Sequence, residues 1–328
     1  MSADRHPTRP SDTMTTDSPP DRTPADEPGD SSTPAAPSSG AGAAATPEAK
    51  KSPEPKKSRA GRDLPAAIGV GGSLGIGIIL ILIFVPTVWY AVVAVSFAVA
   101  TWEVAKRLRD GGYDIALWPL LVGGQAIIWS SWPWGQTGVL VAFAATVLVA
   151  MVWKLLAQGI SNAPENYLRN LAATVLVLAW LPLLASFGAH MVVQDHGAAR
   201  VATLMVVVVC SDVGGYAAGV LFGKHPMAPA ISPKKSWEGL VGSLVVGTTG
   251  AICCVVFLLG SHWWIGAILG PVLVVCATLG DLVESQVKRD LGIKDMGSLL
   301  PGHGGIMDRL DSLLPSALIV WAVLTALL

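Results

Sequence analysis

The amino-acid sequence predicts an all-α polytopic integral membrane protein with about nine transmembrane helices. Of its 328 residues, 52% are hydrophobic and only 14% are charged, whereas soluble globular domains carry about 25% charged residues. After residue 63 the apolar residues form successive runs about 20 residues long, the length that a helix needs to cross a hydrocarbon core about 30 Å thick. The net charge of −1 leaves no polyelectrolyte argument for a nucleic-acid partner.

Residues 1–63 are predicted to form a disordered cytoplasmic tail, and residues 64–328 the membrane-embedded domain. The tail is dominated by Ser, Thr, Pro, Ala, Asp and Gly, and it holds 9 of the 22 Lys/Arg and 10 of the 23 Asp/Glu. So few large apolar residues cannot offset the entropy cost of ordering the backbone. The basic stretch 50–62 has two compatible interpretations. It can attract anionic headgroups, and it can act as an orientation signal that keeps this end in the cytoplasm.

Nine apolar runs are long enough to be placed as spans, with a break at Pro86 between the first two. Their predicted limits are 65–84, 87–105, 115–133, 137–156, 170–190, 200–221, 239–259, 262–281 and 313–328.

The basic residues between the spans predict the orientation. With the tail inside, the cytoplasmic loops carry Lys or Arg in every case, whereas the outer loops carry Arg200 alone. Such an asymmetry is typical of multi-pass proteins, whose cytoplasmic loops are enriched in Lys and Arg. The sequence therefore predicts a multi-pass protein of the cell membrane with a cytoplasmic N-terminus. The basic residues of the predicted cytoplasmic loops are Lys106, Arg107, Arg109, Lys154, Arg169, Lys224, Lys234, Lys235, Lys288, Arg289, Lys294 and Arg309.

Asp212 is the one acidic residue in the predicted span 200–221. An ionisable side chain at such a depth costs a few kcal/mol, so it is expected to be functional or paired. A structural partner such as a lysine or a serine is one possibility. Gly215, Tyr216 and Gly219 follow at i+3, i+4 and i+7, which predicts a small and polar helix face beside Asp212.

The segment 232–239, Ser-Pro-Lys-Lys-Ser-Trp-Glu-Gly, leads into the predicted span 239–259. It places Ser232, Lys234 and Lys235 at the expected start of a helix, where free N–H groups and the helix dipole suit a phosphate. A plain basic loop on the cytoplasmic side explains the same residues, and the segment by itself does not separate the two interpretations.

Four polar side chains share one face of the helix that ends the predicted span 262–281. Asp281, Glu284, Ser285 and Lys288 are spaced i, i+3, i+4 and i+7, which brings them together on a helix. Two carboxylates and a hydroxyl are hard oxygen donors of the kind that Mg²⁺ prefers. The pattern therefore predicts a magnesium site where this helix meets the cytoplasm.

A second pair of carboxylates follows in the segment 301–311, Pro-Gly-His-Gly-Gly-Ile-Met-Asp-Arg-Leu-Asp. Asp308 and Asp311 are again three residues apart, and Arg309 between them is predicted to point elsewhere. Gly304 and Gly305 allow the backbone to approach a ligand closely. Carboxylates with surplus basic residues beside Gly-rich turns are typical of a site for Mg²⁺ and a polyphosphate; a solvated loop with surface ion pairs is the alternative.

The run from Ser285 to Asp311 resembles the signature of phosphatidate cytidylyltransferases, S-x-x-K-R-x4-K-D-x5–6-P-G-H-G-G-x-x-D-R-x-D, without a visible departure. The Asp-Val-Gly-Gly-Tyr run at 212–216 and the segment 232–239 are also similar to motifs of that family. The resemblance covers roughly residues 200–328 by motif, with the catalytic motifs in 210–312, and the membrane region by layout.

The resemblance implies an enzyme that makes CDP-diacylglycerol and pyrophosphate from CTP and phosphatidic acid, in a polar cavity open to the cytoplasm. It implies Asp281 and Asp308 as ligands of Mg²⁺, and we assign Asp311, Glu284 and Asp212 as supporting carboxylates. A second cation such as K⁺ and a homodimer are further implications of the family.

The attacking phosphate of phosphatidic acid is already ionised near neutral pH, so no strong general base is required. Catalysis should consist of positioning and charge neutralisation, and His303 is expected to donate a hydrogen bond to phosphate rather than act as a base. The groups expected to hold the substrates' phosphates are Lys234, Lys235, Lys288, Arg289 and Arg309, with Ser232, Ser285, Gly304 and Gly305 as further nucleotide contacts.

Three other classes of membrane protein share some of these features. A transporter would place its polar residues near the midplane in two related halves, whereas here they cluster at one end without an internal repeat. A CDP-alcohol phosphotransferase would carry a D-G-x-x-A-R signature, which is absent because the only Asp-Gly pair, Asp110-Gly111, is not followed by it. A CTP-dependent lipid-alcohol kinase would share the substrate type without this C-terminal signature.

Overall fold

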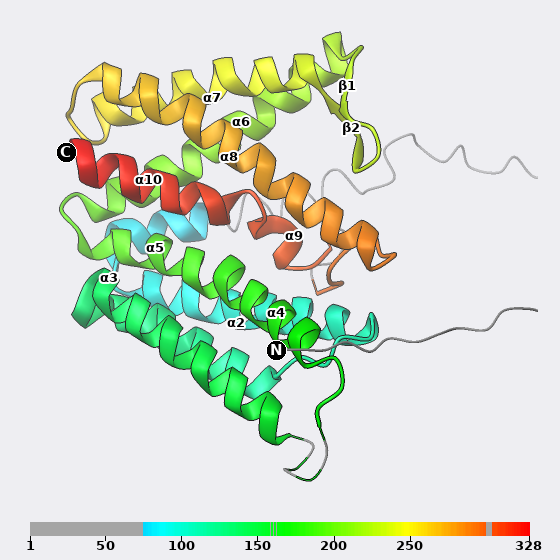
Figure 1. Ribbon diagram of the computed structural model, residues 1–328. Coiled ribbons are helices and arrows are strands. Elements are labelled where there is room, and N and C mark those ends of the chain that lie inside the picture. Colours follow the sequence, from blue (N-terminus) through cyan, green and yellow to red (C-terminus); the bar gives the residue numbers. More distant parts are fainter. Residues whose placement is uncertain (1–74, 158, 160, 162, 300–303) are drawn as a thin grey trace, which may run out of the picture. The chain divides into compact units, whose positions relative to one another are not determined.

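The computed structural model describes residues 75–299 and 304–328, except for residues 158, 160 and 162. The predicted tail over 1–63 and the candidate residue His303 therefore lie outside the described residues. The described residues belong to one compact unit. Their regular structure is helical apart from one short hairpin (Figure 1), so the prediction of an all-α polytopic membrane protein is confirmed.

Within the described ranges, seven helical stretches are long and apolar enough to cross a membrane. They are α2 (Val88–Asp110), α3 (Leu117–Leu156), the composite Tyr167–Val193, α6 (Gly197–Phe222), α7 (Trp237–Phe257), α8 (Trp263–Asp290) and the composite Met307–Leu327. The first composite contains α4 (Tyr167–Leu178), the π-helix η1 (Ala179–Leu183), α5 (Leu184–His190) and the short 3-10 helix η2 (Met191–Val193), and the second contains α9 (Met307–Leu310) and α10 (Leu313–Leu327).

Helix α3 is two helical arms joined at a kink. At Gly135 the backbone has φ 55° and ψ −143°, and Pro133 lies just before it. A straight helix of 40 residues would be about 60 Å long, but a Cβ added at Gly123 would collide with the side chain of Thr146. The arms are therefore antiparallel, and they cover the two predicted spans 115–133 and 137–156.

The remaining difference between the predicted and observed spans lies at the start of the chain. The predicted span 65–84 falls largely outside the described residues. Its described part is a shorter apolar helix, Gly75–Phe84.

The strands β1 (Pro226–Ala228) and β2 (Ser232–Ser236) form an antiparallel hairpin between α6 and α7. The expectation that Lys234 and Lys235 lie at the start of a helix is wrong, because both residues belong to β2. Proline disfavours a helical conformation in the residue before it, which here is Ser232. Helix α7 begins only at Trp237, where the Ser236 hydroxyl caps it by accepting a hydrogen bond of 3.1 Å from the Gly239 N–H, as a serine N-cap does.

Glycines set how closely the C-terminal helices pack, and α6, α7 and α8 lie side by side (Figure 1). A Cβ at Gly214 of α6 would lie 2.6 Å from the Gly242 carbonyl oxygen of α7. A Cβ at Gly280 of α8 would lie 2.6 Å from the carbonyl oxygen of Asp311. Because small residues let helix backbones approach this closely, Gly280 brings the adjacent Asp281 next to the junction of α9 and α10.

The four loops that are predicted to be cytoplasmic lie at the same end of the helices. Contacts connect each of them to another, although the partners are far apart in the sequence. These contacts are Lys154 Nζ to Asp114 Oδ2 at 2.6 Å, the Asp114 N–H to Asn170 Oδ1 at 3.1 Å, Arg107 Nε to the Met296 carbonyl at 2.8 Å, and Arg289 Nε to the Ile231 carbonyl at 3.3 Å.

Candidate active site

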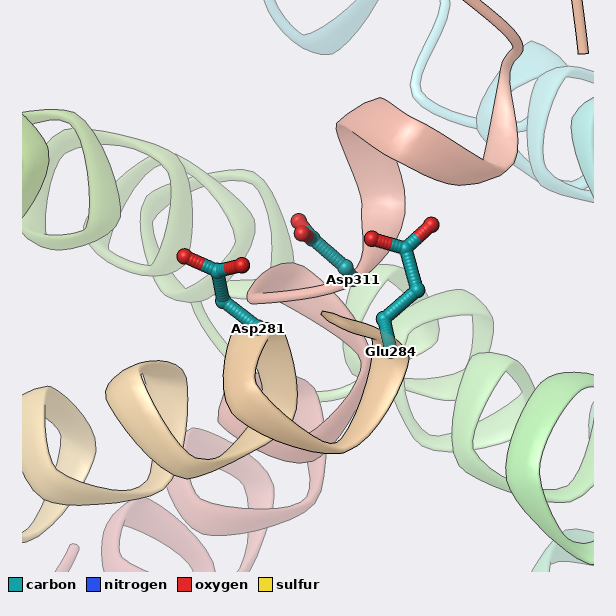
Figure 2. Close-up of side chains that lie close together, drawn as sticks. All are labelled: Asp281, Glu284 and Asp311. Carbon is teal, nitrogen blue, oxygen red and sulfur yellow. The ribbon is translucent and has the colours of Figure 1, made fainter. Parts of the chain in front are cut away.

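Three carboxyl groups converge where α8 passes the junction of α9 and α10 (Figure 2). Asp281 and Glu284 lie one turn apart on α8, and Asp311 follows α9 directly. Each side chain offers an oxygen atom, and these atoms lie within 4.8 Å of one another. Glu284 has no solvent exposure at all. The expected shared face of Asp281, Glu284, Ser285 and Lys288 is present.

The donor set of this cluster fits a hard divalent cation. Carboxylate oxygens are the ligands that Mg²⁺ selects, and carboxylates this close repel one another unless a positive charge lies nearby. Two ammonium groups supply part of that charge from the protein. Lys235 Nζ lies 2.6 Å from Asp281 Oδ2, and Lys288 Nζ lies 2.6 Å from Glu284 Oε2.

A pocket of about 400 Å³ adjoins the cluster, and it is lined by residues from α6, the hairpin, α7, α8 and the α9–α10 junction. Asp212 lines it together with Gly215, Tyr216 and Gly219, so the predicted small and polar face of α6 is confirmed. The other predicted site residues in its wall are Lys234, Lys235, Asp281, Arg309 and Asp311.

Asp308 has a different environment from Asp311. Its carboxylate accepts hydrogen bonds from the N–H groups of Met296 and Gly305, at 3.0 and 2.8 Å, and from Lys288 Nζ at 3.0 Å. Arg309 and Asp311 both line the pocket, and the expectation that Arg309 points away from both aspartates stays a prediction. Asp308 lies near the start of the single turn α9, and its carboxylate turns back onto the amides of the preceding segment.

The remaining predicted residues surround the cluster. The Ser285 hydroxyl donates to Asp281 Oδ1 at 3.3 Å, and Arg289 donates to the hairpin rather than to the cluster. Ser232 pairs with Ala228 in the hairpin. Gly304, with φ +82°, lies against the carboxylate of Asp308, and Gly305 donates to the same carboxylate.

Glu103 of α2 is a buried charged residue beside the site that the motif analysis does not identify. Its side chain accepts a hydrogen bond of 3.0 Å from the Met307 N–H, the residue before Asp308. The signal that could have found it is the one that singles out Asp212, an acidic residue inside a predicted span, here 87–105.

The helices and the pocket define a class of protein, a polytopic membrane enzyme whose carboxylates and lysines suit a phosphate-containing substrate and a divalent cation. A model of the Cytidylyltransferase family matches residues 66–327. The chain belongs to the cytidylyltransferase family, and the recognition of that family from its motifs is confirmed.

Two relatives are similar to the chain over most of both sequences, and a third is similar over about half of its own length. The chain is 56% identical over 287 residues to the phosphatidate cytidylyltransferase of Mycobacterium tuberculosis (strain ATCC 25618 / H37Rv), covering 85% of this chain and 88% of the relative. It is 55% identical over 280 residues to the protein of the same name from Mycobacterium leprae (strain TN), covering 82% and 90%. The phosphatidate cytidylyltransferase of Helicobacter pylori (strain ATCC 700392 / 26695) is 42% identical over 144 residues, 44% of this chain and 53% of the relative. These names support neither a transporter nor a lipid-alcohol kinase.

Proposed function

We propose that the protein is a CTP:phosphatidate cytidylyltransferase, which makes CDP-diacylglycerol and pyrophosphate for phospholipid biosynthesis. Membership of the family and the names of relatives that cover most of both chains support this proposal. The single observation that carries it is the cluster of Asp281, Glu284 and Asp311 beside a pocket that also contains Lys234 and Lys235. A substrate with several phosphate groups suits that combination of charges.

The reaction forms one bond to phosphorus and breaks another. A phosphate oxygen of phosphatidate attacks the α-phosphorus of CTP, and the bond from that phosphorus to the bridging oxygen of the β-phosphate breaks, which releases pyrophosphate. The attacking oxygen is already ionised, so the protein needs to place two anionic groups together and neutralise their charge. Fixed charges in a site that excludes water do this well because they need no reorganisation during the reaction.

The residues of the pocket divide this work. Lys234, Lys235 and Arg309 bring positive charge to the wall and would hold the phosphates of CTP and phosphatidate. Lys235 now pairs with Asp281, and an entering phosphate would compete for its ammonium group. Lys288 forms ion pairs with both Glu284 and Asp308 and so holds these two carboxylates together beside the site.

Mg²⁺ is the proposed cofactor, with Asp281, Glu284 and Asp311 as the residues that would hold it and Asp212 and Asp308 as nearby carboxylates. When bound, it would neutralise charge on the phosphates of CTP and on the leaving pyrophosphate. A second cation such as K⁺ and a homodimer stay predictions from the family resemblance.

We further propose nine membrane crossings, with the N-terminus and the pocket on the cytoplasmic side of the cell membrane. The two arms of α3 support counting that helix twice. The gathering of the basic loops at one end supports a single cytoplasmic face, because Lys and Arg concentrate in cytoplasmic loops. A water-soluble nucleotide and a membrane lipid could both reach a pocket at that end.

The test is a transfer assay on purified protein in mixed micelles of detergent and phosphatidic acid. CTP labelled at the α-phosphate is supplied with and without Mg²⁺, and label entering the lipid is followed. We expect Mg²⁺-dependent transfer that falls at least about 100-fold in Asp281→Asn and Asp308→Asn, since Asp281 would act on charge in the transition state and Asp308 holds the turn that leads to Asp311. Asp290→Asn is the matched control, because Asp290 is exposed at the end of the same helix as Asp281. Correctly inserted protein that transfers no label from CTP would refute the proposed function.

A further inference from the structure

Glu103 connects the N-terminal half of the chain to the C-terminal signature. It lies in the C-terminal half of α2, and only 3% of its surface is exposed. Its Oε2 atom accepts a hydrogen bond of 3.0 Å from the backbone N–H of Met307, 204 residues later in the sequence. A charged side chain is rarely buried unless its partners replace the water that it loses. The groups that the Glu103 carboxylate contacts therefore indicate its role in the structure.

Two glycines make room for the Glu103 carboxylate. A Cβ added at Gly297 would collide with Oε1, and a Cβ added at Gly305 would lie 2.6 Å from Oε2. The same Cβ at Gly305 would lie 2.7 Å from the backbone nitrogen of Gly297. The carboxylate therefore lies where the two described ends of the segment 296–307 come together.

Helix α2 holds both of these ends. Arg107, one turn after Glu103, donates from Nε to the carbonyl of Met296 at 2.8 Å. Glu103 holds the second end at Met307. Asp308 accepts hydrogen bonds from the N–H groups of Met296 and Gly305. The carboxylates of Glu103 and Asp308 therefore both bind backbone amides at these ends.

We propose that Glu103 is a positioning residue of the active site, which fixes the Met307 amide and thereby the turn that carries Asp308, Arg309 and Asp311. Glu103 itself is absent from the residues that line the described pocket, so it acts through that turn and not by touching substrate. The expected effect of Glu103 on turnover rests on the proposed function. Its structural part, the ordering of the described residues 296–299 and 304–308, does not.

Three substitutions separate positioning from simple burial. Glu103→Gln keeps the chain length and one acceptor oxygen, Glu103→Asp is shorter by one methylene, and Glu103→Ala has no acceptor. Because the essential property is an acceptor that reaches Met307, we expect kcat to fall about tenfold or more in the Asp and Ala variants, and to stay within about threefold of the wild type in the Gln variant. Glu165→Ala is the matched control, because Glu165 is exposed in the loop before α4.

Hydrogen–deuterium exchange on the same full-length proteins in detergent gives a readout that needs no turnover. We expect faster exchange confined to the amides of residues 304–308 in the Asp and Ala variants, with peptides of α6 and α7 unchanged. Unchanged exchange of residues 304–308 in the Asp and Ala variants would overturn the proposal. Faster exchange throughout the protein, or a Gln variant as impaired as the Asp variant, would also overturn it. An inactive wild type with these exchange changes intact would instead count against the proposed function alone.

Discussion

Lys288 lies between two buried carboxylates, one on α8 and one on α9. Its Nζ atom is 2.6 Å from Glu284 Oε2 and 3.0 Å from Asp308 Oδ1. The side chains of Glu284 and Asp308 are only 0% and 6% exposed, so water cannot replace the ammonium group as their partner. Removing one partner of a buried ion pair leaves an uncompensated charge, which costs more than the pair contributes when intact.

Lys288→Met is therefore expected to lower the free energy of unfolding by about 3 kcal/mol, because two carboxylates then face each other without their cation. The measurement is the thermal unfolding midpoint in detergent. Lys106→Met serves as the control, since Lys106 is also near the end of a helix but is exposed. Adding Glu284→Gln to Lys288→Met should recover part of the loss, since it removes one of the unpaired charges. Equal midpoints for the two lysine variants would contradict this account of Lys288.

The β1–β2 hairpin is the element that presents Lys234 and Lys235 to the pocket, and it is held at its base and near its turn. At the base, Glu238 of α7 accepts from the N–H groups of Lys224 and His225, both at 3.2 Å, and its Oε1 lies 2.5 Å from His225 Nδ1. Near the turn, Arg289 of α8 donates to the Ile231 carbonyl. An isolated two-stranded hairpin is only marginally stable in water, so these contacts decide where the lysines lie.

Glu238→Ala should accordingly weaken nucleotide binding more than it affects chemistry. We expect the KM for CTP to rise about tenfold, because the loss of hydrogen bonds to a charged group costs about 1.5–3 kcal/mol, while the KM for phosphatidate changes less. Steady-state kinetics in mixed micelles measure kcat, which should change little, and the two KM values, with Glu165→Ala as the exposed control. Equal increases in the two KM values would indicate that the hairpin does not act on CTP in particular.

At the scale of the whole molecule, contacts between distant segments gather the basic loops at one end of the helices. The ion pair of Lys154 with Asp114 connects the end of α3 to the loop after α2. The bond from Arg107 to Met296 connects α2 to the segment after α8. The candidate site lies at this same end, so the orientation of the bundle decides from which side of a membrane CTP can enter.

Cysteine accessibility in sealed vesicles tests this orientation. In a background with the four native cysteines replaced by serine, Asp110→Cys, Lys224→Cys and Asp290→Cys should react with an impermeant maleimide only from the cytoplasmic side. His262→Cys, at the start of α8, should react only from the opposite side. All four native positions are unpaired thiols in the structure, so no disulfide is lost. Labelling of the first three positions from different sides would refute the single cytoplasmic face.

Local patterns in the sequence are sufficient to predict where the helices lie and which side chains share the α8 face of the site. The predicted span 200–221 corresponds to Gly197–Phe222, because a run of apolar residues in a membrane must satisfy its backbone hydrogen bonds within a helix. The spacing of Asp281, Glu284 and Ser285 places them together for a similarly local reason, the helical repeat of 3.6 residues. The motif around Asp308 was also sufficient to recognise the family.

Only the tertiary structure decided which distant groups meet. The packing of Gly280 against the Asp311 carbonyl brings Asp311, and not Asp308, into the cluster with Asp281. Glu103 reaches Met307 across 204 residues, and no spacing along the chain encodes that contact. Periodicity specifies neighbours within a few turns of one helix, whereas neighbours on different helices depend on how closely the whole set of side chains lets those helices pack.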